Sequence, residues 1–393
     1  MLQEALRAAS VPPFHAMAMS RRAADRAAAG RRVLHLEIGQ PSSPATVASR
    51  GAVAQHLAIG DPMGYTTAAG LQPLRERIAQ HYTDWYDTGV DVDAVSVVAG
   101  ASAAFTLAFL AAFDAGDRVG ILEPGYPCYR NTLLALGVQP VAIPVGPDSR
   151  WAPTEAGLDA ALLSAGGLAG LIIASPSNPT GTVLAENTLR MIVAWCARHD
   201  VQLIADEIYH GVVYTGPATS VASLTTDAVV INSFSKYFSM TGWRLGWIIA
   251  PPHLRDAVER LQQNMYICAS HVSQIAGLAA FDAQPELDAH VLRYAANRRL
   301  LVDGLAAARI DRIADADGAF YVYADVGHLL DVGSSPAADT LALCNRWLDE
   351  LDLATTPGID FDLVRGGRFV RFSYAGATEE IDIAIDRLQH WQP

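Results

Sequence analysis

The feature that most constrains the fold is a series of short apolar runs separated by stretches with helical patterning. Several of these runs are apolar at every position, which is typical of strands buried on both faces of a sheet. Because helical stretches separate many of them, the pattern predicts an α/β fold with a mostly parallel sheet between helices. The predicted strands are 95–99, 118–122, 170–174, 201–205, 228–232 and 245–250, and the helices between them include 103–113, 129–136 and 186–199.

The C-terminal part of the chain has a different order of helical and strand-like segments, which predicts a smaller α+β domain. It contains a long helical stretch at 286–308, strand-like segments at 319–324 and 368–373, and helical segments at 337–348 and 379–388. The strand-like segment 33–38 precedes the large domain, so we expect the N-terminal arm to pack with the small one. The predicted boundaries are 1–45 for the arm and part of the small domain, 46–284 for the large domain, and 285–393 for the small C-terminal domain.

Lysine occurs once, at Lys236, and every other residue among the 28 lysines and arginines is an arginine. A genome that favours arginine and alanine codons explains why lysine is rare, but it does not explain why this one remains. Arginine cannot replace a lysine that forms a Schiff base, because its guanidinium stays protonated. Lys236 is therefore a candidate for amine chemistry, although a single remaining lysine is also compatible with chance.

Lys236 lies in a polar segment, 232–247, that begins at the end of an apolar run. Side chains at such strand ends face the crevice where α/β proteins bind ligands. Ser233, Ser235 and Arg244 flank the lysine, and hydroxyl and guanidinium groups are suitable phosphate ligands. A polar surface loop explains the Ser-x-Ser-Lys string equally well on its own, so the string predicts a site only together with other segments.

Two further polar segments also follow apolar runs. Asp206, in Asp-Glu-Ile-Tyr209, is suited to pair with a protonated heterocyclic nitrogen, and Tyr209 to bind a ring hydroxyl. Asn178, in Ser-Pro-Ser-Asn-Pro-Thr-Gly, is held by two prolines and can donate to a phenolate-like oxygen. Taken alone, a helix-capping acid and a plain turn explain these segments. The Asp-Glu pair also suggests ATP or a metal, but the chain has no G-x-x-x-x-G-K-[ST] motif for ATP.

A small-residue segment, Gly100-Ala101-Ser102, separates an apolar run from a helix. Small residues let the backbone N–H groups at a helix start approach an anion, and Ser102 can cap the helix or bind phosphate. Close packing of a strand against a helix explains the same residues.

Together these segments resemble the fold-type-I, class I and II aminotransferases, which depend on pyridoxal phosphate (PLP). The string S-x-S-K-x-x-x-M-x-G-W-R-x-G-W, preceded by D-E-I-Y and S-N-P-T-G, carries a resemblance that extends over nearly the whole chain. It implies a Schiff base between Lys236 and PLP, Asp206 on the pyridine nitrogen, and Asn178 and Tyr209 on the ring O3′. It further implies phosphate ligands at Gly100, Ala101, Ser102, Ser233, Ser235 and Arg244.

The resemblance also assigns residues that touch the ring, the substrate and the partner subunit. Tyr126, in P-G-Y-P-C-Y, corresponds to the aromatic residue that stacks on the ring, with a core tyrosine as the alternative. Arg371 and Gly39 correspond to the residues that hold the substrate α-carboxylate, and Asn178 is also expected to bind the substrate. Tyr65 corresponds to a tyrosine that binds the partner subunit's phosphate, which implies a homodimer with active sites at the interface.

The chain departs from the family pattern at three places. The segment Pro357-Gly-Ile-Asp-Phe-Asp resembles the family's P-G-x-x-F-G loop, with Asp362 where glycine is usual. Because that loop lines the substrate side, we expect an unusual pocket. The Gly-Ala-Ser order leaves the hydroxyl of the phosphate site unassigned, and no arginine is marked for a distal substrate carboxylate.

Composition excludes several other classes of protein. The formal net charge of −13, with no long basic run, argues against nucleic acid or anionic membranes as partners. No two of the cysteines, Cys128, Cys196, Cys268 and Cys344, have C-x-x-C spacing, so we expect no metal site and reduced thiols in a cytoplasmic protein. We expect neither a signal peptide within residues 1–30 nor a membrane span.

The expected activity is a ping-pong transamination between an L-amino acid and a 2-oxo acid. Lys236 is expected to move the substrate proton as a general base and then as a general acid. One alternative is a C–S lyase or other eliminating or substituting enzyme on the same scaffold, because sequence does not show protonation or leaving-group geometry. Another is a non-catalytic PLP-binding regulator, for which the arm before Val33 is expected to be too short to hold a DNA-binding segment.

Overall fold

A seven-stranded sheet forms the centre of the larger body of the molecule. The computed structural model describes residues 4–330 and 337–392. The strand order is β2-β8-β7-β6-β5-β3-β4, and β8 alone runs antiparallel to its neighbours β2 and β7. The predicted mostly parallel α/β sheet is therefore confirmed. The strands are β2 (Val95–Val98), β3 (Arg118–Glu123), β4 (Gln139–Pro144), β5 (Gly170–Ala174), β6 (Gln202–Asp206), β7 (Val229–Ser233) and β8 (Gly246–Ile249).

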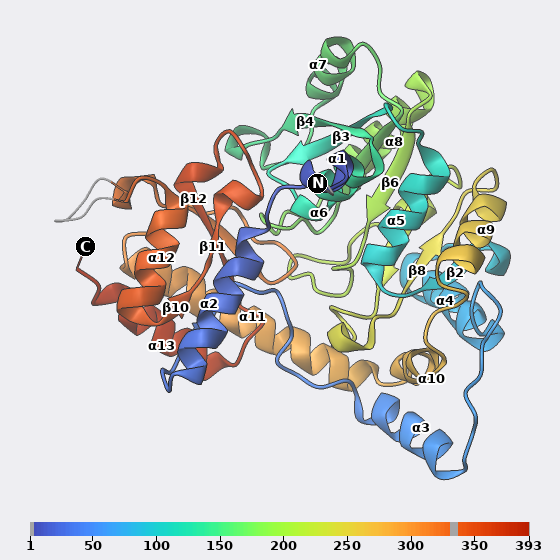
Figure 1. The fold of residues 1–393 in the computed structure, drawn as a ribbon, viewed down its shortest axis with the longest axis horizontal. Helices are drawn as coiled ribbons and strands as arrows, with labels where there is room; N and C mark the ends of the chain where they lie inside the picture. The colour runs from blue at the N-terminus through green and yellow to red at the C-terminus, as the bar shows by residue number, and fades with distance from the viewer. Residues whose placement is uncertain (1–3, 331–336, 393) are drawn as a thin grey trace.

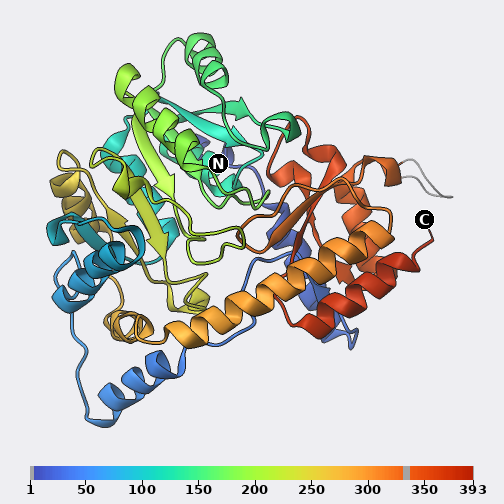
Figure 2. The ribbon, with the colours of Figure 1, turned by 180° about the vertical axis from the view of Figure 1, so that it is seen from behind.

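Helices cover both faces of this sheet, because alternate residues of its strands enter two separate cores. Leu171 and Ile173 of β5 point into one core, and Ile172 between them points into the other. One face is covered by α5 (Ala101–Ala112), α6 (Pro127–Leu136) and α9 (Arg255–Met265) (Figure 1). The opposite face is covered by α4 (Gln72–Tyr86), α7 (Glu155–Ala165) and α8 (Glu186–His199) (Figure 2). Two further helices, α3 (Val47–Ala58) and α10 (His271–Ala280), pack against each other below the sheet.

A smaller body is built around an antiparallel sheet in the order β11-β12-β9. The long helix α11 leads from the larger body into it, and α2 of the N-terminal arm lies beside it (Figure 1). A parallel pairing of β1 with β10 ties the arm to this body. The elements are α1 (Leu6–Ala9), α2 (His15–Ala28), β1 (Leu34–His35), α11 (Gln284–Ala307), β9 (Tyr321–Asp325), α12 (Thr340–Leu351), β10 (Leu353–Ala354), β11 (Thr356–Pro357), β12 (Phe369–Ser373) and α13 (Thr378–Gln389).

The boundaries 1–45, 46–284 and 285–393 remain a prediction, and residues 1–3, 331–336 and 393 of these ranges lie outside the described part. Strand β4 was not predicted. It is an edge strand with Pro140 and Pro144, which an edge tolerates because one side of its backbone needs no partner. Among the described residues, no helix is both long and apolar enough to cross a membrane.

Two buried histidines are expected to make the fold sensitive to acid. Burial lowers the pKa of His81 and of His210 to about 3, compared with about 6.5 in an unfolded chain. Protonation therefore favours the unfolded state, and stability is lost as the pH falls from about 6.5 towards 3. Each histidine contributes a loss of about 2 kcal/mol by pH 5.

This expectation is tested by measuring the free energy of unfolding of His81→Phe against pH. The variant should lose less stability than the wild type between pH 7 and pH 5, because it has one fewer buried group to protonate. His390→Gln, at an exposed position, is the control and should follow the wild type. Identical profiles for all three proteins would contradict the assignment.

Candidate active site

Three predicted polar segments meet at one edge of the large sheet. Asn178 follows β5, Asp206 ends β6, and Lys236 follows β7, and parallel strands bring their carboxyl ends to the same edge. All three line a cavity of about 590 Å³ between the two bodies. The other predicted residues that line it are Gly39, Ala101, Ser102, Tyr126, Tyr209, Ser233, Ser235, Arg244 and Arg371.

Lys236 places an amine of reduced basicity in this cavity. Its Nζ donates to the carbonyl oxygen of Gly39 at 2.7 Å and lies 5.5 Å from the centre of the Tyr209 ring. The pKa of Lys236 is lowered to about 8, mainly by burial and then by the charge of Arg371, while Asp206 opposes the shift. An appreciable fraction of the amine is therefore neutral near physiological pH, as a nucleophile or proton carrier requires.

Asp206 is held by two hydrogen-bond donors. The Tyr129 hydroxyl donates to its Oδ2, and the Ile208 N–H donates to its Oδ1 at 3.1 Å. Burial raises the pKa of Asp206 to about 6, while the two hydrogen bonds and the charge of Lys236 oppose the rise. The carboxylate is therefore ionised above about pH 6 and able to pair with a protonated ring nitrogen.

Arg371 presents a buried positive charge on the opposite wall. Its Nη1 donates to Asn178 Oδ1 at 2.8 Å, and its Nη2 donates to the Glu37 carbonyl oxygen at 2.5 Å. The guanidinium also lies over the ring of Tyr321, 4.3 Å from its centre. Within residues 4–330 and 337–392, Nε has no hydrogen-bond partner and no carboxylate forms an ion pair with this arginine. A guanidinium in this state is chemically suited to pair with a carboxylate.

The start of α5 forms the third part of the site together with Arg244. Gly100 precedes the helix with a φ of +82°, and a Cβ added there would lie 2.6 Å from Arg244 Nη2. Only glycine lets the guanidinium lie this close to the first N–H groups of the helix. Ser233 Oγ lies 2.9 Å from Ser235 Oγ nearby. Hydroxyls, a guanidinium and helix N–H groups together suit a phosphate.

Two residues singled out from the sequence lie away from the cavity. The Tyr65 side chain is 82% exposed and does not line the cavity of its own chain. Asp362 is only 2% exposed, but its carboxylate binds the backbone and side chain of its own loop instead of lining the cavity. The Asp362 side chain therefore does not itself form part of the cavity wall, and the expectation of an unusual pocket stays a prediction.

Sequence reasoning missed several residues of the site. Tyr321 of β9 bonds to the Tyr209 hydroxyl at 2.6 Å, and a Cβ on Gly39 would overlap it. Tyr129, the partner of Asp206, was predicted only as the start of a helix. Phe14 and Met17 of the arm also line the cavity. No local motif marked these residues, because each comes from a segment that is far along the chain from the residues it meets in the cavity.

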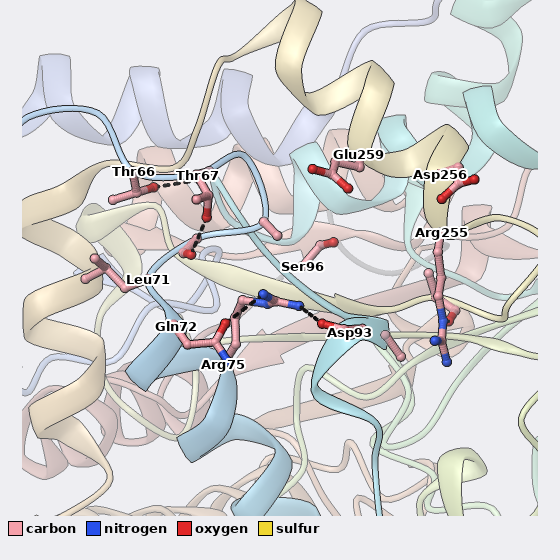
Figure 3. A pocket seen from close by; sticks show the side chains of 14 residues that line it. Thr66, Thr67, Leu71, Gln72, Arg75, Asp93, Ser96, Arg255, Asp256 and Glu259 are labelled. Carbon is pink, nitrogen blue, oxygen red and sulfur yellow. Dashed lines mark hydrogen bonds and ion pairs between the residues drawn. The ribbon is translucent and has the colours of Figure 1, made fainter.

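A second cavity lies beside the edge strand β2, away from these residues (Figure 3). It is lined by Thr67, Arg75, Ser96 and Arg255, among others. Arg75 donates to the carbonyl oxygens of residues 92 and 95, and Arg255 pairs with Asp91 at 2.6 Å. Its arginines are thus satisfied by their own surroundings, unlike Arg371.

Comparison with known proteins decides the family. The family model described as aminotransferase class I and II matches residues 31–388. The chain belongs to the class I and II aminotransferases. The predicted family is thus confirmed, and the chain is an enzyme of the aminotransferase class.

Relatives of this aminotransferase cover it over almost its full length. The valine–pyruvate aminotransferase of Mycobacterium tuberculosis is 48% identical over 98% of this chain and 97% of its own. A crystal structure of an aminotransferase from Mycobacterium tuberculosis superposes with a TM-score of 0.93 and 47% identity, covering 100% of this chain and 99% of that one. Aspartate aminotransferase from Thermus thermophilus, with maleate, gives a TM-score of 0.90 at 27% identity, with 99% of each chain covered. The predicted fold type is thereby confirmed.

The close approach of Gly100 to Arg244 can be tested by substitution. Gly100→Ala should lower the free energy of unfolding by about 2 kcal/mol or more, because it adds both backbone strain and a clash with the guanidinium. The matched control is Gly116→Ala, which also has a positive φ (+97°) but open space around the added Cβ. It should lose only about 1 kcal/mol. If chemical denaturation shows that both variants lose the same free energy of unfolding, the clash with Arg244 does not lower stability.

Proposed function

We propose that this aminotransferase uses pyridoxal 5′-phosphate held by Lys236, and that it moves an amino group between an L-amino acid with an uncharged side chain and a 2-oxo acid. The observation that carries the proposal is that one cavity holds both a partly neutral lysine and a buried arginine, and that this arginine has no ion-paired carboxylate among the described residues. The 48% identical relative is named for valine and pyruvate, which supports a substrate of this size.

The residues around the cavity fit this cofactor. Asp206 suits the pyridine nitrogen, while Asn178 and Tyr209 suit the ring oxygen and Tyr126 the ring face. The phosphate would bind at the start of α5 and at four side chains: Ser102, Ser233, Ser235 and Arg244. Because Gly100 has no Cβ, the Arg244 guanidinium lies against that helix start, where both can bind an anion. When bound, PLP supplies an electron sink for the carbanion formed at the substrate Cα.

The residues of the chain then orient the substrate and move its proton. Arg371 binds the α-carboxylate and fixes which bond of Cα faces Lys236. Lys236 Nζ removes the proton from Cα and later returns a proton, acting first as base and then as acid. Gly39 holds Nζ through its carbonyl oxygen, and Asp206 stays ionised so that the ring nitrogen keeps its proton.

The preference for uncharged side chains rests on the positive charges of the cavity. Among the residues that line it, the cations are Lys236, Arg244 and Arg371, and each already has a role in the proposal. Within the described chain, no further cation lines the cavity to bind a second carboxylate of the substrate. Dicarboxylic amino acids are therefore expected to be poorer substrates.

We further propose a homodimer in the cytoplasm, with Tyr65 binding the phosphate in the partner subunit. Tyr65 is exposed, and so are apolar side chains at the ends of two neighbouring segments, Ile59 after α3 and Ile267 before α10. The segments are joined by a hydrogen bond from His271 to the carbonyl oxygen of Gly64 and by the packing of α3 on α10. A second copy of the chain would bury this apolar surface. The four cysteines are free, which supports a reducing compartment.

The cofactor and substrate are tested together on the purified protein. Added PLP should give a visible absorbance band, and borohydride should fix the cofactor mass on the peptide that contains Lys236. Valine with pyruvate should react faster than aspartate with 2-oxoglutarate. Lys236→Ala should abolish the covalent product, because the chain has no other lysine. A colourless protein would refute the cofactor, and release of pyruvate and a thiol from cystathionine would favour the C–S lyase.

The shared site is tested by mixing two inactive variants, Lys236→Ala and Tyr65→Ala. Neither should be active alone, but in a mixed dimer one site has Lys236 from one subunit and Tyr65 from the other. Random pairing should restore about a quarter of wild-type activity, as expected for a symmetric dimer. No recovery after unfolding and refolding the mixture, despite recovery of the wild type, would rule out this arrangement.

A further inference from the structure

The loop that contains Asp362 is held together by that carboxylate. It lies between two short 3-10 turns, Gly358–Asp360 and Gly366–Arg368. Asp362 Oδ1 accepts the N–H groups of Val364 at 2.9 Å and Arg365 at 2.7 Å, and Oδ2 lies 2.7 Å from Arg365 Nε. Glycine, which the family's loop usually has at this place, would remove all three contacts.

Arg365 connects this loop to the large sheet. Its Nη2 donates at 2.7 Å to the carbonyl oxygen of Glu123, the last residue of β3. Close by, the Gly125 N–H donates at 2.9 Å to the carbonyl oxygen of Phe361. The loop of the small body is therefore bonded to the turn of the large body that leads into Tyr126.

A second arginine closes a ring of contacts. Arg130 of α6 lies with its Nη1 3.5 Å from the buried carboxylate of Glu123, and its Nη2 donates at 3.1 Å to the carbonyl oxygen of Asp360. Burial and the negative charge of Asp362 raise the pKa of Glu123, while the two arginines lower it. We call these five residues the interbody clasp: Glu123, Arg130, Asp360, Asp362 and Arg365.

The interbody clasp reaches three parts of the cavity wall. The Asp360 carboxylate accepts the N–H groups of the first two residues of α2, at 2.9 and 2.8 Å, next to Phe14 in the wall. The bond at Gly125 fixes the backbone next to Tyr126. The ring of Phe361, the neighbour of Asp362, lies 4.8 Å from Arg371 Cζ. Of these parts, Phe361 contacts Arg371, the residue proposed to bind the substrate carboxylate, whereas Tyr126 lies on the side proposed for the cofactor ring.

Apart from Tyr126, the groups proposed to bind the cofactor rest on other contacts. Lys236 is held by Gly39, Asp206 is held by Tyr129 and Ile208, and Arg244 donates to the Thr241 carbonyl oxygen at 3.0 Å. Loosening the clasp should therefore affect the substrate side more than the cofactor side.

We propose that Asp362 and Arg365 are positioning residues that hold the substrate side of the cavity in its binding conformation before substrate arrives. A wall that is already ordered loses less entropy when a ligand binds, so the clasp sets substrate affinity. This inference rests on the proposed function for the nature of the substrate. The contacts that hold the loop in place can be tested without knowing the substrate.

The first experiment measures amide hydrogen exchange in Asp362→Gly and in a control. Exchange in residues 14–17, 123–129 and 358–366 should be about tenfold faster in Asp362→Gly, because these segments lose a shared support. The matched control is Arg368→Gln, which breaks an ion pair with Asp325 on the outer side of the same small body. It should exchange like the wild type in all three segments.

The second experiment separates the substrate from the cofactor. In Asp362→Gly, the KM for the amino donor should rise about tenfold, while kcat and the dissociation constant of PLP change less than about twofold. Asp362→Asn keeps an oxygen that accepts the two N–H groups but loses the negative charge that pairs with Arg365. Its KM should therefore lie between those of the wild type and Asp362→Gly. If Asp362→Gly does not fold, Arg365→Gln replaces it, with the same expected result.

Unchanged exchange in the variants would overturn the proposal. So would an equal loss of PLP affinity and substrate affinity, or the same changes in Arg368→Gln, because either would indicate general loosening of the small body. A failure of the proposed function is distinguishable, because it would appear in the wild type as absent PLP binding or absent transamination, with the exchange comparison unaffected.

Discussion

The register of the parallel strands is the constraint on which the whole site depends. Backbone hydrogen bonds place Ala174 of β5 opposite Asp206, and Asp206 opposite Ile231 of β7. The carboxyl ends of these strands are therefore level, and Asn178 and Lys236 reach the same cavity a few residues later. A slip of one residue would turn each side chain to the other face of the sheet. The two apolar cores that fix the register therefore also determine which polar side chains meet in the cavity.

Arg371 joins three parts of the chain that are far apart in sequence. From β12 it contacts Asn178 of the large body, Glu37 of the arm and Thr356 of β11. Burying a guanidinium is costly, and here hydrogen bonds to neutral oxygens and two aromatic rings offset part of that cost without neutralising the charge. The same side chain therefore packs the small sheet and leaves a positive charge at the cavity wall.

The sequence predicted the buried strands and the polar segments at their ends, because those signals are local: runs apolar on both faces, followed by residues with distinctive chemistry. It did not predict β4, whose prolines and mostly unburied residues hide an edge strand. Nor did it find Tyr129 and Tyr321, which bond to Asp206 and Tyr209 across 77 and 112 residues. Such contacts exist only after the helices and sheets have packed, and the proposed place of Tyr65 requires a second chain as well.

The single lysine has a consequence for how an aldehyde would interact with this protein. Aldehydes condense with neutral amines, and on most proteins surface lysines compete for them. Here every other basic side chain counted with Lys236 is a guanidinium, which stays protonated and does not condense. The one lysine amine available lies inside the cavity with a pKa of about 8. The surface of this chain therefore offers no lysine amine to reactive carbonyl compounds, and the protein can work among aldehydes and 2-oxo acids without forming Schiff bases at stray lysines.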